Sequence, residues 1–492
     1  MLTIFDLTLA PISAVLAYHL IHSIFLFSWW VAIPTALWAA IFTIIGFHWS
    51  FWKVALTTMP RDVHGLYLLF KVKSDLRMRM SRNETISQIF ESEVLPERAR
   101  KVALISVDTG AEYTFEQMHD AANQVANYFH DRGLRQGDVV ALYMNNCPEY
   151  VITWLGLSRL GVVTAWINYN LRQASLVHCI DIAKAKAVIV DQDLQSAISE
   201  VYTDGSLADP PATYVYGAVT NDDLNKMGAT DYKTGMESSK KECVHRNSTS
   251  FKDMLCYIYT SGTTGLPKAA YIKHLRYYFM CRGVAQAFNL CPTDRVYVTM
   301  PMYHSAAGVL GVGQCLTQGC TLVIRKKFSA SRFWDDCVKY GCTASQYIGE
   351  VCRYLLAQPF KESEARHSVR LLYGNGLRPD IWRQMVKRYK ITQIGEFYGS
   401  TEGNSNIVNT WNYPGAVGFL PIYTFLHPLF PVSLIKVDET TGEIVRDSNG
   451  LCIRCQTGET GQMVGRIIKN DALLDFQARC ACFTESSVVR SK

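Results

Sequence analysis

The chain has 492 residues, of which 49% are hydrophobic and 19% are charged, so it can bury a large core divided between two or more lobes. This composition excludes a disordered or fibrous protein. The formal net charge of +6, from 49 basic and 43 acidic residues, is small for this length and gives no support for nucleic-acid binding. The 15 cysteines follow no regular spacing, which is typical of a reducing compartment rather than of a disulfide scaffold.

The first predicted element is a long apolar stretch near the N-terminus. Residues 7–52 contain no Asp, Glu, Lys or Arg and are rich in Leu, Ile, Phe, Ala and Trp. About 20 such residues are enough to cross the hydrocarbon of a bilayer. We therefore expect a membrane anchor over residues 1–60, with one span or with two spans broken near Pro34. A cleaved signal peptide is disfavoured because the basic first region is missing and the apolar run is too long.

A basic segment over residues 61–98 follows the apolar stretch. Close to that stretch the cations outnumber the acids, with Lys53, Arg61, Lys71, Lys73, Arg77, Arg79 and Arg82 against Asp62 and Asp75. By the positive-inside rule, this predicts an integral membrane protein whose body lies in the cytoplasm. We expect the membrane to be the endoplasmic reticulum, the plasma membrane or both, and the sequence does not distinguish them. Residues 65–80 mix apolar and basic side chains. They suit a helix lying on anionic lipid or a helix packed on the protein itself, and the sequence leaves both open.

The body that follows alternates helical patterns with short apolar runs. Thr114 and Gln117 form a capping-box pattern at the start of a helix that ends before Gly133. Further on, apolar runs at 139–144, 162–167 and 187–190 alternate with helical patterns at 148–160 and 173–183. This alternation predicts a mostly parallel sheet with helices on both faces. No G-x-G-x-x-G string follows these strands, which disfavours a dinucleotide-binding dehydrogenase.

A second set of strands and helices follows a polar stretch. We interpret residues 205–249 as a surface connection because they are rich in polar residues and contain two adjacent prolines. Strand-like runs at 295–298, 321–324 and 369–372 are interleaved with helical patterns such as 331–339. The expected fold class is therefore α/β, with two parallel-sheet lobes.

The most informative stretch is a loop rich in glycine and hydroxyl groups. It follows a buried strand predicted at 255–259 and ends at Lys268. Glycines let backbone N–H groups turn toward an anion, hydroxyls add donors and the lysine adds a charge. The candidate nucleotide-binding residues here are Tyr259, Thr260, Ser261, Gly262, Thr263, Thr264, Gly265 and Lys268. The loop differs from a Walker A loop because Ala269 stands where the magnesium-binding hydroxyl should be.

With its closing Pro267-Lys268, this loop resembles the phosphate loop of the adenylate-forming, AMP-binding superfamily, which includes the acyl-CoA synthetases. A second signature of that superfamily is present as Tyr398-Gly399-Ser400-Thr401-Glu402. The resemblance implies that Tyr398 packs on adenine, that Thr401 contacts the α-phosphate of ATP or AMP, and that Glu402 holds Mg²⁺. The chemistry agrees, since a carboxylate oxygen suits magnesium and a flat ring suits a base.

Two further strings extend the resemblance. The string Tyr373-Gly-Asn-Gly-Leu-Arg-Pro379 matches the adenine-binding turn of the superfamily, which implies nucleotide contacts from Gly374, Asn375 and Gly376. The string Pro301-Met-Tyr-His-Ser305 matches a motif whose histidine lies near the acyl carboxylate. Without that match, a lone histidine such as His304 would more often be structural. The implied catalytic residues are Lys268, His304, Thr401 and Glu402.

Within the superfamily, the chain resembles the fatty acid transport proteins, also called very-long-chain acyl-CoA synthetases. The strings that carry this resemblance are Arg325-Lys-Lys-Phe-Ser-Ala-Ser-Arg-Phe-Trp-Asp-Asp336, Gln346-Tyr-Ile-Gly-Glu350 and Ile394-Gly-Glu-Phe-Tyr398, together with the apolar N-terminus. It implies an AMP-binding domain over residues 99–469 with a small β region, acting on a long-chain or very-long-chain fatty acid. The acid and ATP form an acyl-adenylate, and coenzyme A then displaces AMP. Membrane lipid is the other implied partner, and a homo-oligomer stays open.

The end of the chain departs from the family pattern. Relatives continue with a small mobile domain that bears a lysine needed for adenylation, and we find no matching sequence after residue 469. We expect the small C-terminal domain to be absent and residues 470–492 to form a divergent, disordered tail. Two interpretations follow. The chain is a fatty acid–CoA ligase coupled to uptake, or it is a non-catalytic transporter or binding subunit that associates with a full-length ligase.

Overall fold

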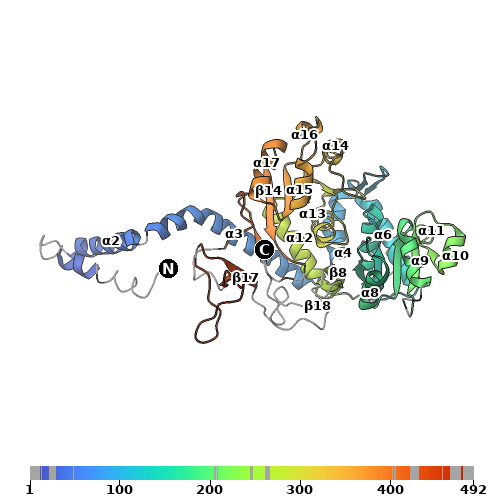
Figure 1. The fold of residues 1–492 in the computed structure, drawn as a ribbon, viewed down its shortest axis with the longest axis horizontal. Helices are drawn as coiled ribbons and strands as arrows, with labels where there is room; N and C mark the ends of the chain where they lie inside the picture. Colours follow the sequence, from blue (N-terminus) through green and yellow to red (C-terminus); the bar gives the residue numbers. More distant parts are fainter. Residues whose placement is uncertain are drawn as a thin grey trace. The chain divides into compact units, whose positions relative to one another are not determined.

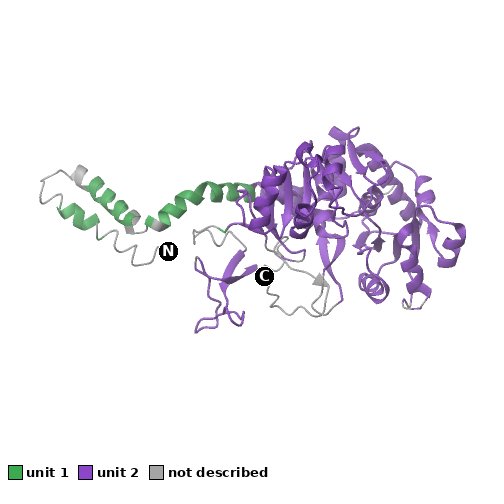
Figure 2. Cartoon of the chain, turned by 45° about the horizontal axis from the view of Figure 1, so that its top comes forward, with its two compact units in different colours: residues 1–69, 420–430 green, residues 70–419, 431–492 purple. Residues whose placement is uncertain are grey.

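The chain divides into two compact units. A computed structural model describes residues 12, 14–20, 29–47, 49–203, 205, 207, 209–243, 248–260, 266–401, 403, 406–420, 432–456, 458–465 and 478–479. The first unit comprises residues 1–69 and 420–430, and the second comprises residues 70–419 and 431–492 (Figure 2).

The described part of the first unit is helical. It contains α2 (Trp29–Phe47) and the first part of α3 (Trp49–Arg82). On α2, large apolar side chains such as Trp38 and Phe42 are exposed, and the helix carries no charged residue. Among the residues described, none of the helices has both the length and the apolar character needed to span a bilayer.

The second part of α3 packs on the body of the second unit. Leu76 is buried on this helix, and Arg79 is only 3% exposed. Asp75 accepts hydrogen bonds from the Tyr278 hydroxyl at 2.9 Å and from the Arg282 Nε at 2.7 Å. Two placements were predicted for residues 65–80. The buried face of this segment packs on the protein itself, which is one of them.

The first lobe is built on a sheet of eight described strands in the order β18-β9-β8-β4-β3-β5-β6-β7. Two of them, β8 and β18, are labelled in Figure 1. The strands are β3 (Val139–Tyr143), β4 (Val163–Trp166), β5 (Ala187–Asp191), β6 (Ala212–Tyr216), β7 (Thr230–Asp231), β8 (Met254–Thr260), β9 (Lys268–Lys273) and β18 (Ala478–Arg479). The strands from β8 to β7 in this order pair in parallel, whereas β9 is antiparallel to β8 and to β18. The mostly parallel sheet predicted for this region is confirmed.

Three helices of this lobe begin and end close to the predicted positions, namely α6 (Phe115–Asp131), α7 (Pro148–Arg159) and α8 (Gln173–Ala183). The lobe also contains elements that were not predicted, namely η2 (Gln192–Leu194), α9 (Gln195–Thr203), α10 (Asn221–Met227) and α11 (Tyr232–Glu237). At the start of α6, the Gln117 N–H donates to the Thr114 Oγ1 at 3.1 Å, and the Thr114 N–H donates to the Gln117 Oε1 at 2.8 Å. This reciprocal pair is the predicted capping box.

The interpretation of residues 205–249 as a surface connection is wrong for the middle of that stretch. Residues 212–216 form β6, which pairs in parallel with β5 and buries Tyr214 and Val215. The short helices α10 and α11 follow, with Thr220 and Asp231 as their N-caps. The strand has only five residues and the helices have seven and six, so their polar exposed faces outweigh the apolar signal of so short an element.

The second lobe is built on another sheet of eight described strands, in the order β15-β14-β13-β12-β10-β11-β1-β2. The strands are β1 (Val102–Ser106), β2 (Glu112–Thr114), β10 (Arg295–Val298), β11 (Thr321–Ile324), β12 (Ala344–Ile348), β13 (Leu371–Asn375), β14 (Gln393–Tyr398) and β15 (Ile407–Val408). The strands from β14 to β1 are parallel, and the outermost strands β15 and β2 are antiparallel. The fold is therefore α/β with two lobes, as predicted.

The remaining elements complete this lobe. Its helices and helical turns are α4 (Ile86–Ile89), η1 (Phe90–Val94), α5 (Leu95–Arg98), α12 (His274–Phe288), η3 (Ser305–Val309), α13 (Val312–Gln318), α14 (Phe333–Lys339), α15 (Gly349–Leu356), α16 (Ser363–Arg366) and α17 (Pro379–Tyr389). A two-stranded antiparallel sheet of β16 (Val432–Lys436) and β17 (Gly461–Gly465) corresponds to the small β region. Of the predicted tail over residues 470–492, the structure describes only β18, and the rest lies outside the described residues.

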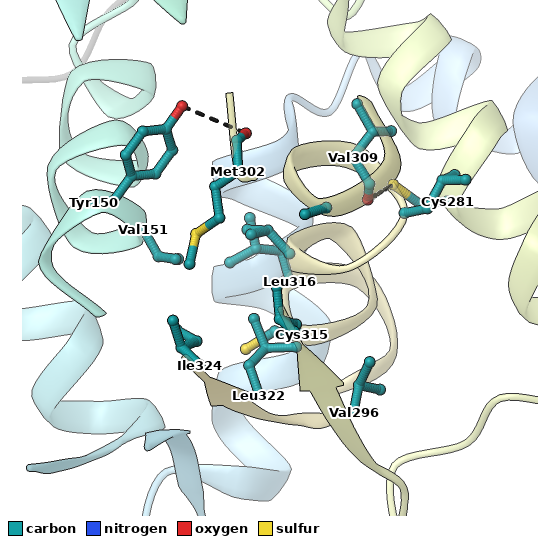
Figure 3. Close-up of a cluster of buried hydrophobic side chains, with 14 of the residues drawn as sticks. Tyr150, Val151, Cys281, Val296, Met302, Val309, Cys315, Leu316, Leu322 and Ile324 are labelled. Atoms are coloured by element: carbon teal, nitrogen blue, oxygen red, sulfur yellow. Dashed lines mark hydrogen bonds between the residues drawn. The ribbon is translucent and has the colours of Figure 1, made fainter. Parts of the chain in front are cut away.

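A buried apolar cluster joins the two lobes. Leu316 on α13 packs above β10 and β11, close to Met302 and to Val151 on α7 (Figure 3). The Tyr150 hydroxyl on α7 donates to the Met302 carbonyl at 3.5 Å, and the Cys281 Sγ on α12 lies 3.2 Å from the Val309 carbonyl. Helices of one lobe and strands of the other thus share a single core.

His274 makes the stability of this fold depend on pH. Its ring is 1% exposed at the start of α12, and its Nδ1 accepts a hydrogen bond from the Ile86 N–H at 3.2 Å. Burial lowers the pKa of His274 from its ordinary value of 6.5 to about 3. Between these two pKa values the unfolded chain binds a proton that the folded chain does not, so stability falls as the pH falls.

We expect His274 alone to lower the free energy of unfolding by about 2 kcal/mol between pH 7 and pH 5. The variant His274→Asn keeps a side-chain acceptor without a group that titrates in this range, so it should lose correspondingly less stability. Urea unfolding of both proteins at the two pH values measures the difference. Equal losses in the two proteins would show that the buried ring does not control this pH dependence.

Candidate active site

Three of the predicted motifs follow parallel strands of the second sheet. The segment 301–305 follows β10, the turn 374–376 lies at the end of β13, and the segment 398–401 lies at the end of β14. The strands β13 and β14 are direct neighbours, with Gly374 paired to Glu396. Since ligands of open α/β sheets bind outside the carboxyl ends of the strands, these three segments share the edge where a site is expected.

A buried carboxylate fixes the turn at the end of β13. The Oε1 atom of Glu396 accepts hydrogen bonds from the Gly376 N–H at 2.7 Å and from the Leu377 N–H at 3.2 Å. Its other oxygen accepts a hydrogen bond from the Tyr347 hydroxyl on β12. Glu396 is 2% exposed, and burial raises its pKa although these donors oppose the shift. The turn is therefore held by an internal anion rather than by solvent.

Two different constraints require glycine in this turn. A Cβ atom at Gly374 would lie 1.9 Å from the Tyr347 carbonyl oxygen, so the close approach of β12 and β13 requires glycine. Gly376 has a φ of +82°, which side chains rarely tolerate. Asn375 and Gly376 are exposed at the sheet edge, whereas Gly374 is buried. The part of the predicted adenine-binding turn that is open to a ligand is thus Asn375-Gly376.

The structure brings the segments 301–305 and 398–401 into contact. The Ser305 and Thr401 hydroxyl oxygens lie 2.9 Å apart. His304 is exposed beside them, and its Nδ1 accepts a hydrogen bond from the Ala306 N–H at 3.3 Å at the start of η3. Tyr398 is half-buried and Gly399 is exposed, while Thr401 is 8% exposed. The predicted acyl-carboxylate motif therefore adjoins the predicted α-phosphate motif.

Two neighbouring residues on α12 hold both of these segments. The Arg276 Nη2 donates to the Thr401 carbonyl at 2.8 Å and also to the Gly403 carbonyl. The Tyr277 hydroxyl donates to the Gly308 carbonyl of η3 at 2.8 Å. Together with the contact between Ser305 and Thr401, these bonds close a ring that joins α12, the 398–403 turn and η3.

The predicted phosphate loop leaves β8 and returns into β9. Thr260 and Lys268, at its two ends, are paired across these antiparallel strands, and Lys268 is 8% exposed. Five predicted residues of this loop, Ser261, Gly262, Thr263, Thr264 and Gly265, lie outside the described residues, as does Glu402. Because β9 runs directly into α12, the end of the loop is linked to the helix that holds the other two segments.

Helix α8 binds both ends of the predicted phosphate loop. The Tyr259 hydroxyl donates to the Cys179 carbonyl at 2.5 Å. The adjacent His178 places its Nε2 2.9 Å from the Pro267 carbonyl oxygen, and since a carbonyl oxygen only accepts, the ring must donate. The hydroxyl of Tyr259 is therefore engaged by the backbone of α8.

The described residues include no group of three or more His, Cys, Asp or Glu side chains that could enclose a metal ion. Binding of Mg²⁺ needs no such cluster, because an ion that arrives with polyphosphate needs only one or two protein carboxylates. Glu402 is the predicted carboxylate.

Comparison with known proteins identifies the family. Residues 92–465 match the model of the AMP-binding enzyme family. The chain is 43% identical over 433 residues to the human (Homo sapiens) long-chain fatty acid transport protein 1, covering 87% of this chain and 66% of that protein. It is 42% identical over 454 residues to the mouse (Mus musculus) protein of the same name, covering 91% and 69%. The chain belongs to the AMP-binding enzymes, in the fatty acid transport protein family. It spans about two thirds of the length of these relatives.

Solved structures show that this AMP-binding enzyme shares its fold with CoA ligases. The anthranilate CoA ligase AuaEII, crystallised with anthranoyl-AMP, superposes with a TM-score of 0.65 at 21% identity and covers 77% of this chain and 69% of its own. A fatty acyl CoA synthetase from Mycobacterium tuberculosis gives a TM-score of 0.60 at 20% identity, with coverages of 75% and 68%. At these identities the likeness concerns the fold alone.

Sequence reasoning missed the residues that hold the motifs of this AMP-binding enzyme. They are His178, Arg276, Tyr277 and Glu396. Glu396 gave one usable signal, since it is the only acidic residue in the otherwise apolar stretch 394–398. His178, Arg276 and Tyr277 lie on ordinary helical patterns, and only the folded chain brings them to their partners.

We expect His178→Leu to raise the dissociation constant of ATP about tenfold, because the Pro267 carbonyl loses its donor and the end of the loop is released. His178→Gln retains an amide N–H donor and serves as the matched control, which should stay within about threefold of the unchanged protein. Isothermal titration calorimetry with ATP compares the three proteins. If the leucine variant binds ATP as tightly as the unchanged chain, α8 has no role in shaping the loop.

Proposed function

We propose that this chain activates a long-chain or very-long-chain fatty acid as an acyl-adenylate, transfers the acyl group to coenzyme A, and thereby drives fatty acid uptake at a membrane. One observation carries the proposal. The Thr401 hydroxyl, assigned to the α-phosphate, lies 2.9 Å from the hydroxyl of Ser305, which follows the histidine assigned to the acyl carboxylate. Adenylation requires these two groups of the substrates to meet. The family and the CoA ligase fold support the same reaction.

The proposed chemistry has two balanced steps. A carboxylate oxygen of the fatty acid attacks the α-phosphorus of ATP, and the bond to the leaving pyrophosphate breaks. The coenzyme A thiol then loses its proton, its sulfur attacks the acyl carbon, and AMP leaves with the electrons of the carbon–oxygen bond. A carboxylate is a poor electrophile, so the mixed anhydride with AMP supplies the leaving group that thioester formation needs.

Each site residue has a defined part in this proposal. The ammonium group of Lys268 neutralises phosphate charge, and the Thr401 hydroxyl donates to the α-phosphate. His304 is exposed and precedes Ser305, which contacts Thr401, so it lies at the edge where a carboxylate would enter. Mg²⁺, held by Glu402 and phosphate oxygens, would supply the charge neutralisation that lets pyrophosphate leave. Preorganised donors of this kind commonly supply the largest part of such a rate enhancement.

The N-terminal helices support a place at a membrane. On α3, exposed Phe70 and Met78 share a face with exposed Lys71, Lys73 and Arg77, a combination that suits the boundary between acyl chains and anionic headgroups. A long fatty acid resides in lipid because each buried CH₂ is worth about 0.8 kcal/mol. We propose that residues 1–60 anchor the chain and that the body faces the cytoplasm at the endoplasmic reticulum or the plasma membrane.

The adenylation step can be tested by itself. Radiolabelled pyrophosphate should exchange into ATP when the purified chain receives fatty acids of graded length, with the highest rate for long chains. Lys268→Ala should lower this exchange by about 10² to 10³ because it removes a preorganised charge from the transition state. Lys273→Ala, at the other end of β9, is the matched control and should exchange like the unchanged chain.

Absence of exchange in the unchanged chain would reject the enzymatic proposal. The alternative is then a non-catalytic fatty acid transporter or binding subunit. That role is recognised if cells expressing Lys268→Ala take up fatty acid as fast as cells expressing the unchanged chain.

The membrane proposal has a separate test. Membranes from cells that express the chain are washed with alkaline carbonate, which releases peripheral proteins. We expect the chain to stay in the pellet because the apolar side chains of residues 7–52 remain in hydrocarbon. Protease added to sealed vesicles that expose their cytoplasmic face should digest the body. Recovery of the chain in the carbonate supernatant would contradict the anchor.

A further inference from the structure

Among the described residues, the 398–403 turn is bonded by a charged side chain of helix α12. Its backbone turns between Ser400 and Gly403, where the Gly403 N–H donates to the Ser400 carbonyl at 3.2 Å. The half-buried Arg276 of α12 donates to the Thr401 and Gly403 carbonyls from one terminal nitrogen. Hydrogen bonds from a charged donor are about twice as strong as neutral ones. The guanidinium thus holds the backbone on both sides of position 402.

Helix α12 is fixed independently of this turn. The Leu275 N–H donates to the Phe251 carbonyl at 2.9 Å, and Tyr277 is bonded to Gly308. Two turns further along, the Arg282 Nε donates to Asp75 at 2.7 Å and its Nη1 donates to the Gln318 Oε1 at 2.6 Å. A residue on so constrained a helix can impose its position on the turn to which it is bonded.

We propose that Arg276 is a positioning residue that sets Thr401 for contact with the nucleotide α-phosphate. The inference rests on the proposed function, because that function gives Thr401 its phosphate contact. Arg276 acts through the turn, since both of its described bonds to the turn end on backbone carbonyls. Without it, the two carbonyls lose a charged donor, and nucleotide binding must also order the turn.

Arg276 binds the site, whereas Arg282 on the same helix only supports the fold. Arg276 and Arg282 lie on the same helix, both are half-buried, and both bind oxygen acceptors. Arg282 binds Asp75 and Gln318, which are not part of the site. Loss of either arginine removes one cation from α12, but only loss of Arg276 releases the turn.

The test is the binding of AMP to the full chain, purified in detergent, with EDTA present so that no metal contributes. Isothermal titration calorimetry should show Arg276→Met binding AMP about tenfold more weakly than the unchanged chain, as expected for the loss of a charge-assisted bond. The matched control Arg282→Met should bind AMP within about twofold of the unchanged chain. Thermal unfolding without ligand establishes that both variants are folded.

A double-mutant cycle with Thr401→Val then identifies the path of the effect. If Arg276 acts by placing the Thr401 hydroxyl, Arg276→Met should weaken AMP binding by less than about twofold once that hydroxyl is gone. The inference is overturned if Arg276→Met binds AMP as well as the unchanged chain does, if Arg282→Met loses as much affinity, or if the Arg276 effect persists in full in the valine background. An unchanged chain that binds no AMP would instead refute the proposed function, and the inference with it.

Discussion

The candidate site depends on the fixed position of α12 between the two sheets. This helix starts where β9 ends, and β9 is a six-residue strand that begins at Lys268. The first turn of the helix is therefore connected directly to the end of the predicted phosphate loop. The first two residues of the helix are buried. The next two bind neighbouring segments: Arg276 binds the 398–403 turn and Tyr277 binds η3. Segments more than 100 residues apart in the sequence are therefore located by one rigid element. A displacement of α12 would move all three together rather than open a gap between them.

A buried arginine contacts the far side of the same helix at a cost that its ion pairs must offset. Arg79 on α3 is almost fully buried, and it binds Glu84 at 2.7 Å and the Tyr278 hydroxyl of α12 at 3.2 Å. Taking such charges out of water is expensive, and removing one partner of a buried pair typically costs about 3–5 kcal/mol. The contribution of these pairs is therefore specificity of placement. The end of α3 and the start of α12 have one satisfied arrangement, since any slip would strand a buried charge.

The sequence predicts the boundaries of helices and strands well where the apolar pattern is regular. It predicts them less well where a buried position is polar. The boundaries of α8, β10 and β11 match the predicted ranges because their residues are periodic or continuously apolar. The strand β12 includes Ser345 and Gln346, and β14 includes Glu396, so their apolar pattern is interrupted and neither was predicted as a strand. The motifs were recognisable because each is a short local string. Arg276 and His178 were not, since their partners lie 125 and 89 residues away and only tertiary structure pairs them.

The buried polar residues that interrupt the apolar pattern of β12 and β14 have a common structural effect at the sheet edge. Glu396 costs stability as a buried carboxylate, and that cost is offset by three donors, two of which are backbone N–H groups of the turn at the end of β13. The amide of Gln346 likewise donates to the Ala306 carbonyl in η3. Each buried polar side chain thus fixes the backbone of a neighbouring segment in advance of any ligand. Preorganisation of this kind lowers the ordering cost of binding, so the same residues that weaken the strand signal are those that prepare the edge for a nucleotide.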